Sequence, residues 1–212
     1  MTLALSEALG GTGPELDTGR DAMAVRILDA AMDQLLAHGL RHFSVDEVAR
    51  RAKVNRITIY RRFAGKDELL RGVILREGRR LFTAVDTAIS GLASPHDQIV
   101  EGFAAAVTLV RGHPLVARLR AHEPDTLGAL FVVHGPMVLA LARQYLVGHV
   151  VQAQQSGHLA TVDAEVVAEL AVRLSLTLVM LPESRIPLDS ADDARRFARQ
   201  YLAPALGRKG TA

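Results

Sequence analysis

The chain has no cysteine and no tryptophan, and aromatic residues make up only 4% of its 212 residues. Without cysteine it has no disulfide, no thiolate metal ligand and no cysteine nucleophile, which suits a reducing compartment. The eight histidines have no thiolate partners, and we expect neither a metal site nor another cofactor.

The sequence also predicts neither a signal peptide nor a membrane-spanning run. The first residues, MTLALSEALGG, contain no basic residue and no long apolar stretch, so they do not resemble a signal peptide. The longest apolar run, residues 103–110 with one threonine, is far shorter than the roughly 20 residues that a membrane span needs. We expect a cytoplasmic protein without membrane contact.

Strand-like runs of β-branched residues are nearly absent, whereas alanine, leucine and arginine, all good helix formers, are abundant. This predicts an all-α protein, and its length allows one or two domains with a sizeable core. No Gly-x-Ser-x-Gly elbow and no complete phosphate-binding loop is present, so we do not expect an enzyme.

The net charge of +2 is distributed unevenly. Residues 1–19 carry three acidic side chains and no lysine or arginine, residues 20–66 carry ten basic and five acidic ones, and residues 67–212 carry fifteen of each. The positive excess therefore lies in one short segment. Positive side chains there would bind DNA phosphates and release the counterions of those phosphates. A solvated basic surface is the alternative explanation.

Residues 1–20 contain two glycine clusters and no periodicity, which predicts a flexible arm. From Asp21, a plausible N-cap, apolar residues recur at three- and four-residue spacing. This pattern predicts a helix that ends at Gly39, a plausible C-cap.

The segment SVDEVARRAKVNRITIYRRFAGKDEL, residues 44–69, is the most informative stretch. Ser44 and Glu47 have the spacing of a capping box at the start of one helix, and Asn55 is a good N-cap for the next. Ala64-Gly65 ends that helix before another begins at Lys66 and runs to about residue 90. The predicted inward residues of the first two helices are Val45, Val48, Ala49, Ala52, Ile59 and Phe63. A helix held by its apolar side while it presents arginines outward suits a DNA major groove.

This segment resembles the DNA-binding domain of TetR/AcrR-family transcription regulators. The resemblance covers about residues 21–70 and rests on Val48-Ala49, Val54-Asn55, Ile59-Tyr60, Phe63, Gly65-Lys66 and Leu69. It implies a homodimeric regulator, most often a repressor, with a variable helical ligand-binding domain. A small molecule bound there would shift the helix that begins at Lys66 and so change the separation of the two DNA-reading helices.

By the family's pattern, five side chains face the DNA groove and three lie at phosphates. The first set is Asn55, Arg56, Ile57, Tyr60 and Arg61, and the second is Ser44, Thr58 and Lys66. Arginine can pair with O6 and N7 of guanine, and helix N-termini offer free N–H groups to phosphate. Ile57 either contacts a thymine methyl group or is simply an exposed or helix-packing residue.

One departure from the family concerns the turn between the two helices, where Lys53 replaces the usual glycine. If the backbone is left-handed there, a side chain costs about 1–2 kcal/mol. The placement of side chains on the following helix does not depend on that residue.

Beyond residue 90 the sequence resembles the family only in being helical, with prolines at starts and connections. The predicted helices are 95–111, 114–121, 125–133, 136–156, 163–181 and 190–205. The apolar faces of 136–156 and 163–181 are long enough to predict a dimer seam. We expect a mainly hydrophobic effector, and the candidate pocket residues are Phe82, Phe103, Arg118, Phe131, His134, Met137 and Tyr145. The alternative is that the apolar ones are plain core and that Arg118 and His134 lie at the surface or in loops.

These observations divide the chain into an N-terminal arm (1–20), a three-helix DNA-binding domain (21–66, motif 44–63) and a helical ligand-binding and dimerisation domain (67–212). They predict a sequence-specific transcriptional regulator whose partners are a double-stranded DNA operator, a second copy of the chain and a small molecule. The alternative is a helical carrier of small molecules with a vestigial DNA-binding domain.

Overall fold

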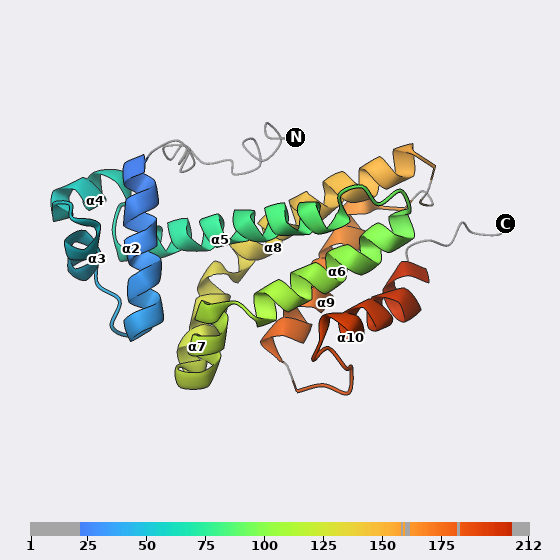
Figure 1. Cartoon of the computed structure of the whole chain (residues 1–212). Coiled ribbons are helices and arrows are strands. Elements are labelled where there is room, and N and C mark those ends of the chain that lie inside the picture. The colour runs from blue at the N-terminus through green and yellow to red at the C-terminus, as the bar shows by residue number, and fades with distance from the viewer. Residues whose placement is uncertain (1–21, 158, 160–161, 182, 205–212) are drawn as a thin grey trace. The chain divides into compact units, whose positions relative to one another are not determined.

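A computed structural model of the chain describes residues 22–157, 159, 162–181 and 183–204. The predicted arm and the predicted N-cap Asp21 lie outside these residues. The described residues form nine α-helices, α2 to α10, and a short π-helix, η1, and contain no strand (Figure 1). The all-α prediction is therefore confirmed.

The helices fall into two compact units. The first consists of the described residues up to Gly78 together with His113–Val138, and the second of Arg79–Gly112 together with the described residues from Leu139 onward. The long helices α5 (Lys66–Ile89) and α8 (Pro124–Gln155) contribute residues to both units.

The first unit contains a small helical bundle of α2 (Ala22–His38), α3 (Val45–Ala52), α4 (Arg56–Arg62) and the start of α5 (Figure 1). All four helices contribute apolar side chains to one core, whose fully buried members include Ile27, Leu28, Val48, Ile59, Phe63 and Leu69. Burying these side chains is what holds such short helices together, because helices of seven or eight residues are not stable alone.

The predicted helix ends are confirmed in part. Gly39 follows α2 with φ of +76°, the left-handed conformation of a C-terminal cap. The Asn55 side chain accepts a hydrogen bond from the backbone N–H of Ile57 at 2.9 Å, as an N-cap should.

The predicted capping box of Ser44 and Glu47 is wrong. The Ser44 side chain makes no capping hydrogen bond, and its backbone N–H donates instead to Oε1 of Gln34 at 3.3 Å. The carboxylate of Glu47 accepts hydrogen bonds from Arg50 and Arg51, one turn further along α3. Charged partners outcompete a neutral backbone N–H for a carboxylate because charge-assisted hydrogen bonds are stronger.

The predicted break near residue 134 is also wrong, because α8 runs without interruption past Pro136. A proline removes one backbone hydrogen bond from a helix, here the one that residue 136 would donate to residue 132. In a helix of 32 residues the remaining hydrogen bonds on both sides keep the chain helical.

Among the described residues, α8 is long and apolar enough to cross a membrane if length and composition alone are considered. The longest uninterrupted apolar run of the sequence does not indicate this helix, because its apolar character is an average over a window that also contains polar residues. Few residues of this apolar stretch are buried within the chain. Such helices also occur in water-soluble proteins, where a partner helix covers them.

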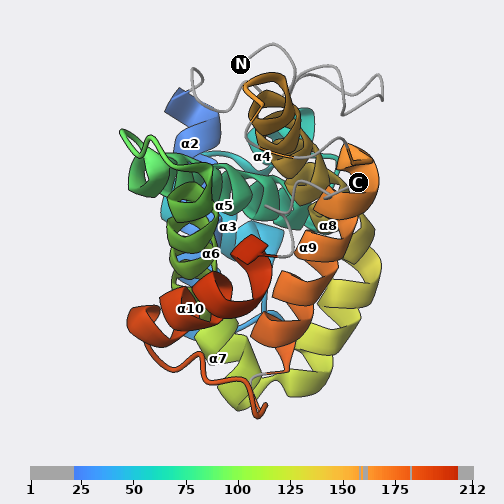
Figure 2. The same ribbon diagram turned by 90° about the vertical axis from the view of Figure 1, so that its right-hand side faces the viewer.

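The second unit packs α6 (Pro95–Arg111), α9 (Ala164–Met180), α10 (Ala191–Phe197) and η1 (Ala198–Leu202) together (Figure 2). Its buried residues include Val100, Ala104, Val107, Leu178, Ala194 and Ala198. A capping box of Ser190 and Asp193 begins α10, so the predicted start of the last helix is confirmed.

Candidate DNA-binding site

The turn between α3 and α4 is formed by Lys53 and Val54. Lys53 has φ of 53° and ψ of 46°, a left-handed conformation, and its backbone N–H donates to the last turn of α3. The chain thus makes the tight turn expected of a helix-turn-helix without a glycine. The Arg26 side chain on α2 donates to the carbonyl of Ala52 at 3.1 Å, which satisfies an unpaired acceptor at the end of α3.

Helix α4 has one buried face and one exposed face. The side chains of Ile59 and Phe63 are completely buried in the bundle, which confirms both as inward residues. On the other face, Ile57 is 67% exposed and Tyr60 43% exposed, and Asn55, Arg56 and Arg61 are exposed as well. The five residues predicted to face the DNA groove therefore lie together on the solvent side of one short helix.

An isoleucine that is two-thirds exposed between arginines has no packing role within the described part of the chain. Exposure of its apolar side chain to water is unfavourable, and this side chain could contact the methyl group of a thymine. The exposure of Ile57 thus argues against the alternative that it packs against another helix of the same chain.

The guanidinium of Arg56 is held by two partners. Its Nη1 lies 2.9 Å from Oδ1 of Asp46 on α3, and its Nη2 donates to the Tyr60 hydroxyl at 3.1 Å. The guanidinium carbon also lies 5.2 Å from the centre of the Tyr60 ring. The hydroxyl of Tyr60 and the charge of Asp46 raise the pKa of Arg56, so this residue is a permanent cation.

Asp46 is not among the residues predicted from the sequence to contact DNA. An acidic residue in the first turn of a helix is common because it interacts favourably with the helix dipole, so the position of Asp46 gives no sign of a role at this site. The contact with Arg56 spans ten positions and a turn, so no helical spacing could have predicted it.

A second charged cluster lies along α3. The carboxylate of Glu47 receives hydrogen bonds from Arg50 at 2.6 and 2.9 Å and from Arg51 at 2.8 Å. The hydrogen bonds from these two arginines lower the pKa of Glu47 to about 2. Two of the ten basic residues of the positive segment are therefore partly neutralised within the protein.

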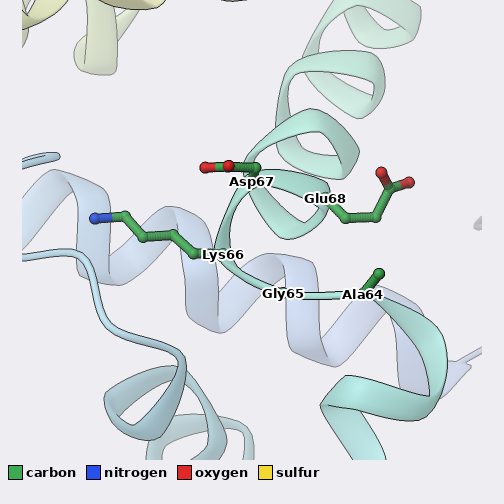
Figure 3. A pocket seen from close by; sticks show the side chains of 5 residues that line it. All are labelled: Ala64, Gly65, Lys66, Asp67 and Glu68. Atoms are coloured by element: carbon green, nitrogen blue, oxygen red, sulfur yellow. The ribbon is translucent and has the colours of Figure 1, made fainter.

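The three predicted phosphate contacts lie at helix N-termini. Ser44 precedes α3 and is half-buried, Thr58 lies in the first turn of α4, and Lys66 begins α5. An open hollow at the start of α5 is lined by residues 64–68 (Figure 3). The first-turn N–H groups of a helix of 24 residues carry a partial positive charge, which favours an anion.

The side chains of Lys66 and Glu68 point away from each other at this hollow (Figure 3). The Lys66 ammonium lies 5.9 Å from the centre of the Phe43 ring. Asp67 and Glu68 stabilise the start of α5 through its dipole but would repel a phosphate, so Lys66 is the side chain here that can bind one. Among the described residues no group of three acidic, histidine or cysteine side chains could hold a metal ion.

Comparison with known proteins identifies this arrangement. Residues 27–73, which extend from α2 into α5, match the family model of bacterial regulatory proteins of the tetR family. This segment therefore has the sequence of a tetR-family DNA-binding region. Relatives of the chain are named HTH-type transcriptional regulators, and the chain is a DNA-binding transcriptional regulator.

Similarity extends beyond the TetR-type DNA-binding segment. The chain is 27% identical over 187 residues to the HTH-type transcriptional regulator AlkX of Mycobacterium tuberculosis, and the match covers 86% of each protein. Its fold is also that of the TetR-family repressor AlkX from Dietzia sp., with a TM-score of 0.63, 22% identity, and coverage of 88% of this chain and 95% of the other. The repressor QsdR of R. erythropolis has a TM-score of 0.64 at 19% identity, with coverage of 91% and 100%.

The predicted effector residues are distributed over both units. Arg118, Phe131, His134 and Met137 lie in the first unit, and Phe82, Phe103 and Tyr145 lie in the second. Phe103 packs against Phe197 with the ring centres 5.6 Å apart and belongs to the core of the second unit. The structure brings Phe82 and Tyr145 into contact, and the assignment of all seven residues to an effector pocket stays a prediction.

Phe82 and Tyr145 belong to a polar and aromatic cluster between α5 and α8 in the second unit. Their rings stack with centres 4.4 Å apart, and the Tyr145 hydroxyl donates to Oδ1 of Asp86 at 2.6 Å. His149 lies edge-on to the Tyr145 ring, and its Nε2 is 3.4 Å from the same oxygen. Burial, and then the carboxylate of Asp86, raise the pKa of Tyr145, so its hydroxyl stays protonated and remains a donor.

Proposed function

We propose that α4 enters the major groove of a double-stranded DNA operator as the recognition helix. Arg56, Ile57, Tyr60 and Arg61 face the base edges in this proposal, with Asn55 at the start of the helix. The observation that carries it is the division of α4 into a fully buried face and an exposed face with two arginines and an exposed isoleucine. Ser44, Thr58 and Lys66 bind the flanking phosphates.

The regulator acts as a homodimer in this proposal, because operators read by helix-turn-helix proteins are usually two half-sites related by symmetry. Support comes from α9, where Val166 is 53% exposed and Leu170 63% exposed. Unpaired apolar stripes of this kind mark interaction surfaces. Residues 67–212 would then carry dimerisation and ligand binding, and residues 21–66 DNA binding.

We further propose that the protein is a cytoplasmic repressor released by a small, mainly hydrophobic effector. The Dietzia protein AlkX of the same fold is implicated in the biodegradation of n-alkanes, and the stacked rings of Phe82 and Tyr145 offer an apolar surface with a polar edge. An effector releases DNA only if it binds the DNA-free conformation more tightly than the DNA-bound one.

The DNA-binding proposal is tested with two kinds of substitution in the full chain. Lys66→Ala removes a phosphate contact, so it should weaken binding to every DNA sequence and reduce the slope of log affinity against log salt by about 1. Arg61→Ala should relax discrimination at particular base pairs. Both are measured by fluorescence anisotropy with duplexes selected from a random library.

A matched control is Arg199→Ala, which removes one exposed positive charge from the second unit. It should change neither the affinity nor the salt slope. Wild-type affinity and base preference in both Lys66→Ala and Arg61→Ala would show that the assignment of α4 is wrong. A salt-dependent preference for selected DNA would also exclude the vestigial-domain alternative.

A further inference from the structure

The carboxylate of Asp46 lies against α4, the proposed recognition helix. Asp46 lies in the first turn of α3, and its two carboxylate oxygens are 2.9 and 3.1 Å from Nη1 of Arg56, the first residue of α4. Both side chains are more than half exposed, at 64% for Asp46 and 57% for Arg56. An ion pair so exposed to water contributes little to folding stability. The role of the pair must therefore be sought in the position that it gives to Arg56.

The contacts restrain a side chain that is otherwise among the most flexible. Asp46 holds one terminal nitrogen of Arg56, the Tyr60 hydroxyl holds the other, and the Tyr60 ring lies beside the guanidinium. A guanidinium has five N–H donors, more than these two partners require. An arginine fixed in this way loses less rotamer entropy when it binds a base, which is the benefit of preorganisation.

Asp46 also changes which DNA group Arg56 prefers. A free arginine on a DNA-facing surface is attracted to the nearest phosphate, which adds affinity without sequence preference. A carboxylate beside the guanidinium offsets part of its charge and repels phosphate oxygens, so this competing interaction weakens. The carboxylate weakens the interaction of Arg56 with guanine less, because the base edge of guanine offers two neutral acceptors.

We propose that Asp46 is a specificity-determining positioning residue, which holds Arg56 in the orientation that reads a guanine and away from the phosphates. The inference rests on the proposed function of α4 as the recognition helix. It assigns to a residue of α3 an effect on base preference that acts through Arg56.

The test compares full-length wild-type protein with Asp46→Ala, Asp46→Asn and Arg56→Ala. Binding sites are selected from a random double-stranded DNA library, and base preference at each position is measured by competition anisotropy. Arg56→Ala should lose about 10- to 100-fold discrimination at one position of each half-site. Both Asp46 variants should lose about 5- to 10-fold at that same position, and they should bind non-specific DNA more tightly than wild type.

Two further variants separate positioning from a structural role. Glu47→Ala removes a neighbouring acidic residue of α3 whose partners are Arg50 and Arg51, and it should leave the base preference unchanged. The double variant Asp46→Ala with Arg56→Ala should match Arg56→Ala alone, because Asp46 acts through Arg56. Asp46→Asn keeps the shape of the side chain, so it serves if Asp46→Ala does not fold.

The possible outcomes distinguish this inference from the proposed function. If Arg56→Ala changes the preference at one position and the Asp46 variants do not, or change all positions equally, the inference is overturned while α4 remains the recognition helix. If neither Arg56→Ala nor Arg61→Ala alters any preference, the assignment of α4 fails, and the inference fails with it.

Discussion

At the scale of single residues, the turn of the helix-turn-helix depends on an unfavourable backbone conformation. Lys53 is the non-glycine residue with positive φ among the described part of the chain. Its side chain is exposed, so burial of the side chain does not offset the cost of this conformation. The packing of Val48, Ala49 and Ile59 against the bundle must hold the turn in this conformation.

Lys53→Gly should stabilise the protein. The substitution removes a left-handed penalty of about 1–2 kcal/mol, offset by the greater freedom of glycine in the unfolded chain, about 0.4–1 kcal/mol. The expected net rise in the free energy of unfolding is about 0.5–1 kcal/mol, measured by urea denaturation without DNA. Lys53→Ala removes the same charge but keeps the β-carbon, and should give no such rise. An equal rise in both variants would attribute the effect to charge.

Another residue-scale constraint lies between α2 and α3. The buried carboxylate of Glu123 accepts the backbone N–H of Arg41 at 3.1 Å, and a β-carbon at Gly39 would lie 1.6 Å from its Oε1. Gly39 is thus required both for its φ of +76° and for the space that the carboxylate occupies. This loop is held by a residue more than eighty positions away in the sequence.

At the scale of elements, the two helices of the DNA-binding motif begin differently. Helix α4 has a side-chain cap, because Asn55 accepts a hydrogen bond from Ile57. Helix α3 has none, and a buried glutamine from α2 serves its start instead: Gln34 accepts from the N–H of Ser44 and donates to the carbonyl of His42. The start of α3 is therefore stabilised by tertiary contact and the start of α4 by local sequence.

This difference predicts unequal effects of two similar substitutions. Asn55→Ala should lower the free energy of unfolding by about 1 kcal/mol, because it leaves a helix N–H without its cap. Ser44→Ala should lower it by much less, since its side chain makes no capping hydrogen bond and its backbone N–H is unchanged. Chemical denaturation of both variants without DNA decides the point. Equal losses would mean that Ser44 caps α3 in solution.

At the scale of the whole molecule, an apolar stripe along α9 is left uncovered in the single chain. Three apolar residues of this helix recur every four positions, and their side chains are 37–63% exposed: Val166, Leu170 and Leu174. Residues four apart lie on one face of a helix, so they form a continuous surface. Arg143 on α8 pairs with Glu165 and Glu169 of α9, which links the two helices expected to form the seam.

Leu170→Glu should therefore convert the proposed dimer into a monomer. A charge buried in an apolar seam costs more than a dimer of moderate affinity can offset, so sedimentation velocity at micromolar concentration should show a monomer. Operator affinity should fall with it, because the two recognition helices would no longer bind as a linked pair. Leu109→Glu, at a leucine 43% exposed on α6, is the matched control and should remain dimeric. A wild-type protein that sediments as a monomer would refute the seam.

The sequence alone determined the features that depend on residues a few positions apart. Apolar spacing predicted the buried faces of α3 and α4, Asn55 and Ser190 predicted helix starts, and Gly39 predicted a helix end. The motif at residues 44–69 led to the family for the same reason, because its short helices and turns are encoded by local spacing.

Only the tertiary structure decided which of several possible partners each polar side chain takes. Gln34 rather than Glu47 receives the N–H of Ser44, Asp46 pairs with Arg56 across a turn, and Glu123 holds the loop after α2. Such choices depend on competition among groups that come into contact only when the chain has folded. The spacing of residues along the sequence therefore cannot predict them.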